Sequence, residues 1–370
     1  ESPRLPVLLF LVGLGLDLFG NHRVVDGHLR SNFQFAGDLG LLGAGDLPLV
    51  VTFLDDDLGG VEQAAGGVEL DDETFVAPRG GEVDGAEDEG FFASDFTLAE
   101  IKTLHAKQAF GERPHQFDGK FEIPTLQEII ALVKRKTLEK GRVIGIYPET
   151  KHPTYHQALG LPLEGRLLKV LTQAGWNHRN APVFIQSFEQ GNLIALSKQT
   201  SVRLIQLIDA NDVNPDGSLD FTAPFDRPYD WTASGKPELL SRTFGYLTTD
   251  AGLREVASYA YGIGPWKRYI VSTVANPDGS GPGEAKLKLA EPTDLIERAH
   301  AAGLKVHTWT FRNEQRRLAG IGRRDRTAHV GEHSMEALGR NLGTTLRDPV
   351  EHLEIVDYRV RKVAREAIVQ

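Results

Sequence analysis

The chain has 370 residues, of which 41% are hydrophobic and 25% are charged, so it can bury a large core in one or two domains. Its formal net charge of -10 argues against a nucleic-acid partner, because phosphate backbones are bound by clustered lysines and arginines. The absence of cysteine excludes disulfides, thiolate nucleophiles and cysteine-ligated metal sites.

The first apolar stretch, residues 6–20, is 15 residues long, whereas a membrane-spanning helix needs roughly 20. Asp17 interrupts it, and Arg4 is the only basic residue before it, so the basic start typical of a signal peptide is missing. We expect a buried strand or helix here, and no transmembrane segment.

Residues 1–90 are acidic and rich in glycine. They hold four arginines, no lysine and 18 aspartates or glutamates, a net charge of -14, while the rest of the chain has a net charge of +4. They also hold 16 of the 39 glycines. Because glycine disfavours both helices and strands, we expect little regular structure in this segment.

From residue 91 onward, helical and strand patterns alternate. Thr97 with Glu100, and Thr125 with Glu128, are spaced as capping boxes that begin helices, and Gly141 is typical of a helix end. We expect helices from 97 and at 125–140, 161–173, around 196, 253–261 and 295–302, strands at 143–147, 183–188, 204–208 and 306–310, and an apolar run at 269–271.

Strands separated by helices indicate an α/β fold with parallel pairing through right-handed crossovers. Four or five such units suggest a barrel after residue 91. The acidic segment at 1–90 and an arginine-rich tail at 315–370 flank it.

Polar residues at the carboxyl ends of the expected strands are the site candidates, because barrel enzymes place reactive side chains there. They are Glu149, Lys151, Gln186, Trp309 and Asn313. Each has a simpler explanation: a Glu-Thr-Lys triplet is ordinarily a solvated loop pair, a glutamine often satisfies backbone groups, and a tryptophan is more often core than pocket wall.

Six segments carry a more specific signal. In chain order they are DFTLAEIK (95–102), IPTL (123–126), YPETKHP (147–153), FIQSFE (184–189), GIGPWK (262–267) and HTWTFRN (307–313). Together they resemble the long, exported branch of the glycerophosphodiester phosphodiesterases.

The resemblance covers residues 91–314 and implies a (β/α)8 TIM barrel, incomplete or irregular at both termini. It also implies that the barrel hydrolyses small-molecule glycerophosphodiesters to glycerol 3-phosphate and an alcohol, in a periplasmic or secreted setting. It implies a divalent cation, calcium or alternatively magnesium, held by carboxylates. Glu149 matches a cation ligand and Lys151 a lysine near the phosphate; we expect Gln186 and Trp309 to bind substrate beside them. The chemistry agrees, because hard cations prefer oxygen ligands and an ammonium group neutralises phosphate charge.

Three motifs that the family carries near its start cannot be placed in residues 1–90. They are His-Arg-Gly, Glu-x-Asp and His-Asp, which hold the acid–base histidines and two of three metal carboxylates. His22 opens a His-Arg pair without the glycine, and Glu69 and Asp71 lie too close to residue 91 for the strand that should follow. The catalytic residues therefore stay unknown, and a shifted reading frame at both termini is one hypothesis for these departures.

The missing motifs leave an alternative function open: an inactive member of the same fold that binds a glycerophosphoryl or sugar-like ligand. A third reading, a barrel enzyme acting on sugars, needs two carboxylates that flank the scissile bond. The strand ends lack a second carboxylate paired with Glu149, which argues against it.

Three further patterns favour structural explanations. Residues 329–333 have the H-x-x-E-H form of inverted zinc peptidases, but the central glycine weakens the helix that such a site needs. Residues 212–220 match the start of a calcium loop, but Ala223 stands where a bidentate glutamate is required, so we expect a surface turn. A proline lies between His152 and His156, so we expect both in a loop.

Overall fold

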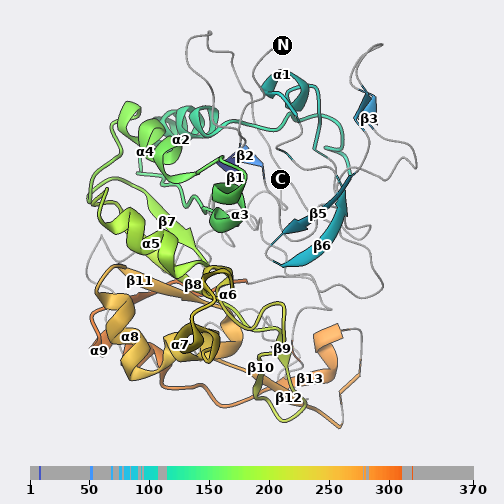
Figure 1. The fold of residues 1–370 in the computed structure, drawn as a ribbon, viewed down its shortest axis with the longest axis vertical. Coiled ribbons are helices and arrows are strands. Elements are labelled where there is room, and N and C mark those ends of the chain that lie inside the picture. Colours follow the sequence, from blue (N-terminus) through green and yellow to red (C-terminus); the bar gives the residue numbers. More distant parts are fainter. Residues whose placement is uncertain are drawn as a thin grey trace. The chain divides into compact units, whose positions relative to one another are not determined.

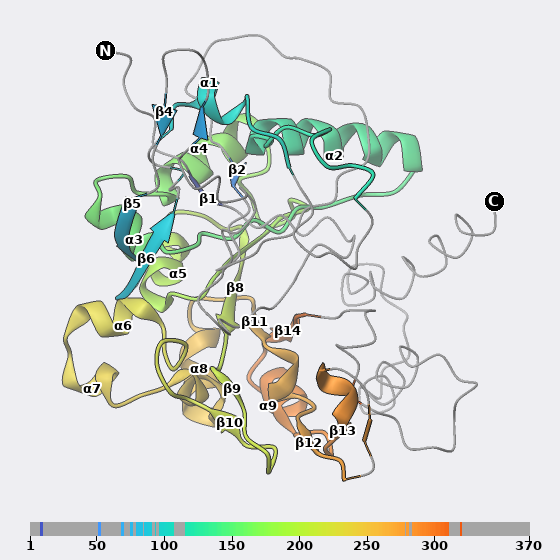
Figure 2. The same ribbon diagram turned by 90° about the vertical axis from the view of Figure 1, so that its right-hand side faces the viewer.

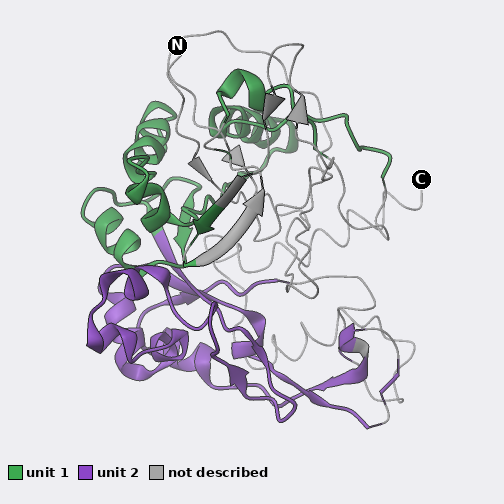
Figure 3. Ribbon diagram, turned by 45° about the vertical axis from the view of Figure 1, so that its right-hand side comes forward, with its two compact units in different colours: residues 1–14, 18–203 green, residues 15–17, 204–370 purple. Residues whose placement is uncertain are grey.

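The structure is a computed structural model, and it describes residues 8–9, 51–52, 68–69, 75–76, 79–83, 85–90, 93, 96–106, 115–277, 279–280, 283–310 and 319. Contacts within the chain divide it into two compact units, residues 1–14 with 18–203 and residues 15–17 with 204–370 (Figure 3). Across the described ranges, no helix is both long enough and apolar enough to cross a membrane.

Short strands form in the acidic N-terminal segment. Strand β1 (Leu8–Leu9) pairs in parallel with β2 (Val51–Thr52), and β3 (Val68–Glu69) pairs antiparallel with β4 (Phe75–Val76). Strands β5 (Arg79–Val83) and β6 (Ala86–Gly90) form an antiparallel hairpin (Figure 1). Gly85 turns the chain between β5 and β6 with a φ of 82°, the left-handed conformation that tight hairpins require. The expectation of little regular structure is therefore wrong for residues 79–90.

The helices α1 (Leu98–Ile101) and α2 (Leu126–Lys140) begin at the two predicted capping boxes. In each box the threonine hydroxyl accepts from the backbone N–H of the glutamate, and the glutamate carboxylate accepts from the backbone N–H of the threonine. Helix α2 ends at Gly141, whose φ of 61° is the left-handed cap conformation. Ile129 and Val133 of its predicted apolar stripe are buried. The structure thus confirms this helix, which Figure 2 shows along its length.

Residues 146–150 run parallel to β7 (Phe184–Ser187). At distances between 2.9 and 3.1 Å, backbone hydrogen bonds run from Ile146 to Pro182, Phe184 to Ile146, Gln186 to Pro148 and Thr150 to Gln186. The strand predicted at 143–147 is therefore displaced toward its carboxyl end. Pro148 has no N–H, so it removes one bond from this ladder without ending it.

Three further helices belong to the first unit: α3 (Pro153–Ala158), α4 (Glu164–Gln173) and α5 (Gln190–Ser197). The loop predicted for both histidines is wrong for His156, which lies within α3 and is buried, whereas His152 immediately precedes the helix. Pro153 does not prevent this helix, because at the first helical position its missing N–H has no helical partner to lose and its fixed φ suits a helix.

The second unit contains three parallel strands: β8 (Arg203–Ile208, of which residues 204–208 fall in this unit), β11 (Gly262–Pro265) and β14 (Lys305–Val306). Strand β11 lies between the other two, pairing Ile263 with Gln206 on one side and with Val306 on the other. All of residues 204–208 are buried, as in a strand covered on both faces.

The connections between these strands carry the further elements of the second unit. From β8 to β11 the described elements are β9 (Asp212–Val213), β10 (Leu219–Asp220), α6 (Tyr229–Ser234), α7 (Pro237–Leu240), the 3-10 helix η2 (Phe244–Thr248) and α8 (Asp250–Ala257). From β11 to β14 they are η3 (Lys267–Tyr269), β12 (Thr273–Ala275), η4 (Gly283–Lys286), β13 (Leu287–Leu289) and α9 (Leu295–Ala301).

Strands β9 and β10 form an antiparallel hairpin at the calcium-loop-like sequence. Gly217 N–H donates to Asn214 O at 2.8 Å, and Ser218 N–H donates to Asp216 Oδ1 at 2.9 Å. The side-chain oxygen of Asp216 thus accepts a hydrogen bond from the backbone of the turn itself. The predicted surface turn is confirmed.

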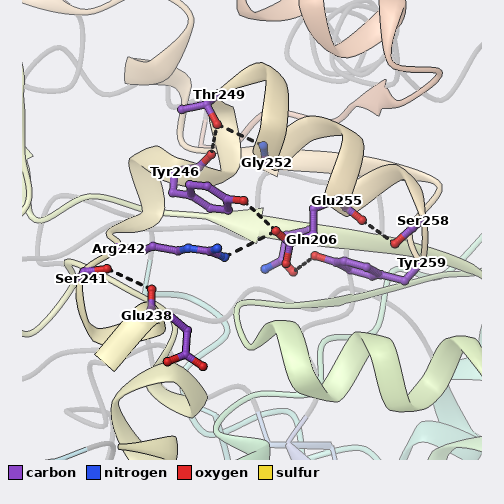
Figure 4. Close-up of polar contacts among 10 residues, drawn as sticks. All are labelled: Gln206, Glu238, Ser241, Arg242, Tyr246, Thr249, Gly252, Glu255, Ser258 and Tyr259. Atoms are coloured by element: carbon purple, nitrogen blue, oxygen red, sulfur yellow. Dashed lines mark hydrogen bonds and ion pairs between the residues drawn. The ribbon is translucent and has the colours of Figure 1, made fainter. Parts of the chain in front are cut away.

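Polar contacts hold α8 to neighbouring elements of the second unit (Figure 4). Glu255 accepts from the hydroxyl of Tyr246 at 2.9 Å and pairs with Arg242 at 3.5 Å. Just after the helix, the hydroxyl of Tyr259 donates to Gln206 Oε1 at 2.8 Å. The fully buried amide of Gln206 on β8 therefore has a structural role, because a buried polar group needs such a partner.

Gly252 in α8 lies against the backbone of η2, where a Cβ would be 2.1 Å from Tyr246 O and 2.8 Å from Leu247 Cα. Replacing a helical glycine by alanine usually stabilises by up to about 1 kcal/mol. For Gly252→Ala we expect the clash to dominate and the free energy of unfolding to fall by about 2 kcal/mol, measured by urea denaturation. Gly165→Ala in α4 is the control: apart from the adjacent residues and the backbone of its own helix, no atom lies within 4 Å of its Cβ, so stability should hold or rise. A Gly252→Ala protein as stable as wild type contradicts the prediction.

Candidate functional site

Glu149 lies on the segment 146–150 that pairs with β7. Successive side chains of an extended strand point to opposite sides, so Tyr147 and Glu149 share one side and Thr150 lies on the other. Thr150 donates its hydroxyl to Asn192 Oδ1 of α5 at 2.6 Å. Glu149 therefore projects from the side of the strand pair that faces away from α5, the side that in a barrel is the interior.

Gln186 stands opposite Glu149 on β7. The two backbones form a parallel bridge, and Gln186 Nε2 donates to Glu149 Oε2 at 3.3 Å. The Glu149 side chain is 1% exposed, and a carboxylate so buried must be held by hydrogen bonds or by a cation. The structure thus brings together two of the residues that the sequence nominates.

An aromatic pair lies next to Glu149 on the same side of the strands. Tyr147 stacks on Phe184 with ring centroids 5.4 Å apart, and the guanidinium of Arg203 lies 3.9 Å from the centroid of Phe184. Burial raises the pKa of the Tyr147 hydroxyl well above its usual range; the positive charge of Arg203 opposes that shift and the negative charge of Glu149 adds to it. Tyr147 is therefore protonated and neutral at physiological pH.

A buried polar network fixes the other side of the strand pair. Thr150 donates to Asn192, and Asn192 Nδ2 donates to Glu164 Oε1 of α4 at 2.6 Å. Ser187 Oγ also donates to Thr150 O at 2.9 Å. All four residues are buried, so the backbone on which Glu149 sits is tied to two helices.

Sequence reasoning did not identify this network. Asn192 and Glu164 stand in helical segments where a polar residue ordinarily faces solvent, and their contacts join positions far apart in the chain. A single signal was available: Thr150 lies between two nominated residues and is turned to the opposite side by the strand alternation.

Lys151 follows directly after the last backbone hydrogen bond of the ladder. It is 5% exposed, and the next residue, His152, has a φ of 48° and a ψ of 47°, a left-handed conformation that few residues other than glycine adopt. The chain therefore turns sharply after Lys151, which is the last side chain before this turn and α3.

Trp309 belongs to the second unit and follows β14. Its indole Nε1 donates to Gly264 O at 2.7 Å, and its backbone forms a parallel bridge with Trp266. The residue as a whole is half-buried, and its ring nitrogen is fixed by this bond. The structure gives its place within its own unit, and a role in substrate binding stays a prediction.

A hard divalent cation such as calcium takes roughly six to eight oxygen ligands. Among the residues that the structure describes, no group of three or more histidines, aspartates or glutamates is arranged to hold a metal ion. Glu149 has the right chemistry for one ligand. The described residues alone therefore do not fit a complete cation site.

Other candidates from the sequence lie outside the described residues. These are His22, Asp71, Asn313 and residues 329–333. Glu69 lies in β3, a strand whose side chains are not described. The expectations for these residues are therefore neither confirmed nor contradicted by the structure.

Comparison with known proteins gives a consistent picture. A model of the glycerophosphoryl diester phosphodiesterase family matches residues 50–330, which extends beyond the motif-bearing region at both ends. The chain is 35% identical over 271 residues to the glycerophosphodiester phosphodiesterase GDPD6 of Arabidopsis thaliana, covering 68% of this chain and 63% of that protein. It is 25% identical over 242 residues to a glycerophosphodiester phosphodiesterase of Haemophilus influenzae, covering 60% of each.

The chain thus spans about three-fifths of the length of these two curated relatives. A solved structure bearing the name of a glycerophosphoryl diester phosphodiesterase, from Silicibacter pomeroyi DSS-3, covers 61% of each chain at 16% identity. Its TM-score is 0.35, a likeness too loose to inform the arrangement of the strands.

Asn192 links Thr150 to Glu164, so removing its side chain should show how much the network contributes to the free energy of unfolding. We expect Asn192→Ala to lower the free energy of unfolding by about 2–3 kcal/mol, because it takes a partner from two buried polar groups. Thr150→Val alone should cost less, and a double-mutant cycle between the two positions should give a coupling energy of about 1 kcal/mol. Urea denaturation of the four proteins measures this, and additive effects would contradict the network.

Proposed function

Because the chain belongs to the glycerophosphoryl diester phosphodiesterase family, we propose that it hydrolyses glycerophosphodiesters to glycerol 3-phosphate and an alcohol. The family has a TIM-barrel-like α/β fold, in agreement with the parallel pairing of β8, β11 and β14. The described strands do not by themselves close a ring.

One observation carries the proposal. Inside the family-matched region, a buried carboxylate, Glu149, stands at the carboxyl end of a parallel strand, and Lys151 follows two residues later. Barrel enzymes place reactive groups at these strand ends. A carboxylate and a lysine two positions apart in the chain suit a phosphodiester, whose hydrolysis needs charge neutralisation.

Members of this family generally depend on a divalent cation. We propose that the cation here is calcium, with magnesium as the alternative, and that Glu149 is one of its ligands. Once bound, such a cation supplies polarisation of the phosphoryl oxygens. The contribution of this chain is to hold the Glu149 carboxylate in place through Gln186 and to keep water away from it by burial.

The other nominated residues would act on the substrate. Lys151 places a positive charge near the phosphate and lowers the cost of bringing its negative charge into a buried site. Gln186 borders the same place through its contact with Glu149. Trp309 is half-buried and its ring nitrogen is fixed by the bond to Gly264, and we propose that its ring packs against the glycerol or the alcohol.

A second candidate is a member of this fold that binds a glycerophosphoryl or sugar-like ligand without hydrolysing it. The observation that favours it is the lack of placeable His-Arg-Gly and His-Asp motifs, since proton transfer would need those histidines. We further propose export to the periplasm or medium, by resemblance to the exported branch. A small molecule rather than nucleic acid is the proposed partner, supported by the charge of -10.

The full chain should hydrolyse glycerophosphocholine with calcium present and lose that activity with a chelator. Glu149→Gln should lower cation-dependent turnover on the order of a hundredfold or more while leaving the fold intact, because it replaces an anionic ligand by a neutral one of equal size. Glu139→Gln, on exposed surface of α2, is the control. Release of choline measures the effect, and unchanged metal dependence in Glu149→Gln would reject the ligand assignment. A wild-type chain without turnover favours the second candidate.

Lys151→Ala should raise KM and lower kcat, reducing kcat/KM by roughly ten- to a hundredfold, because the phosphate loses a charge-assisted contact. Lys198→Ala removes the same charge from an exposed position at the end of α5 and should leave both constants unchanged. Steady-state kinetics with glycerophosphocholine measures both variants. Wild-type values of KM and kcat in Lys151→Ala would count against its role.

A further inference from the structure

Lys151 lies in a short connection that is fastened at both ends. Only residues 151–153 separate Thr150 from Thr154. Thr150 is held at one end, because its N–H donates to Gln186 O at 3.0 Å and its hydroxyl donates to Asn192. The position of Lys151 therefore depends on what holds Thr154 at the other end.

Glu189 holds Thr154. The N–H of Thr154 lies 3.1 Å from Oε2 and 3.3 Å from Oε1 of Glu189, and the Thr154 hydroxyl also donates to Oε2. Glu189 is 3% exposed. It precedes the first residue of α5, yet its side chain makes no cap bond to that helix and reaches across to α3 instead.

Helix α3 needs this external acceptor. His152 precedes the helix in a left-handed conformation and provides no side-chain cap, and Pro153 has no N–H. Thr154 thus carries the first N–H of the helix that can donate, and the groups at a helix start need an acceptor. The carboxylate of Glu189 supplies what a capping side chain at position 152 would otherwise supply.

We propose that Glu189 is a positioning residue: by fixing Thr154 and the first turn of α3, it sets where Lys151 lies. The inference rests on the proposed function, in which Lys151 engages the phosphate of the substrate. Three residues between two anchors have little freedom, and the sharp turn at His152 is maintained by those anchors. Without the carboxylate of Glu189, Thr154 loses this anchor, and the position of Lys151 changes with that of Thr154.

Such a movement has a large kinetic effect, because displacement of a charged group by about 1 Å can lower a reaction rate by a hundredfold. Glu189→Gln keeps the size of the side chain but presents an amide in place of one of the acceptor oxygens. We expect kcat/KM for glycerophosphocholine to fall by roughly ten- to a hundredfold, with an increase in KM. Amide hydrogen exchange in the peptide 150–159 should also become faster, as followed by mass spectrometry.

Glu128→Gln is the matched control, since Glu128 accepts from Thr125 N–H at the start of α2 in the same unit; it also pairs with Lys102 at 2.7 Å. The chemical change is the same, a capping carboxylate replaced by an amide, but α2 is not in the connection that carries Lys151. We expect kcat/KM to stay within about twofold of wild type, and faster exchange to be limited to the first turn of α2 and the residues around Lys102. Thr154→Ser, which keeps both donors, should retain activity.

The result that overturns the inference is a Glu189→Gln protein with wild-type kcat/KM, or a Glu128→Gln protein that loses as much. If Glu189→Gln does not fold, Thr154→Val removes the hydroxyl that donates to Glu189 and so tests the same contact. Unchanged kcat/KM in Thr154→Val would also overturn the inference. If the wild type shows no turnover, the proposed function fails separately. The dissociation constant of inorganic phosphate then replaces kcat/KM, and an unchanged constant together with unchanged exchange at 150–159 overturns the inference.

Discussion

The parallel pairing of residues 146–150 with β7 is the constraint on which the candidate site depends. The ladder fixes which side chains of the segment face the helices and which face away, because alternation along a strand leaves no freedom to exchange the two sides. It runs through Pro148, which removes a single hydrogen bond, and ends where Thr150 meets Gln186. The backbone pairing therefore places Glu149 opposite Gln186, whose side-chain amide also donates to the Glu149 carboxylate.

Neighbouring residues on this strand have different roles, because their side chains lie on opposite sides of it. Glu149 faces the side proposed to bind substrate, whereas Thr150 is bound to Asn192 and, through it, to Glu164 of a second helix. Buried polar groups so arranged are rigid only when each has its partner. Residues of the candidate site and residues that support it thus alternate along the strand. A substitution in α4 or α5 can therefore shift the position of Glu149 although it makes no contact with Glu149.

The second unit shows the same use of buried polar contacts. The amide of Gln206 accepts from Tyr259, and Trp309 donates to a carbonyl at the end of β11. Both contacts fix a side chain by a group that belongs to a different element.

The sequence by itself determined the elements whose signals are local. The capping boxes at Thr97 and Thr125 and the stop at Gly141 are short-range hydrogen bonds and dihedral preferences, and the structure confirms them. The six ordered segments identified the family in the same way, from contiguous residues. The prediction failed at His156, where Pro153 was taken to exclude a helix that it in fact begins.

Only the tertiary structure decided how the site is held. The strand expected at 143–147 is displaced because its register is set by hydrogen bonds to β7, more than thirty residues away. The contacts of Thr150 with Asn192 and of Thr154 with Glu189 span 42 and 35 positions. No local pattern marks those partners, because an asparagine or a glutamate becomes a support only when folding brings a buried donor to it and excludes water from both.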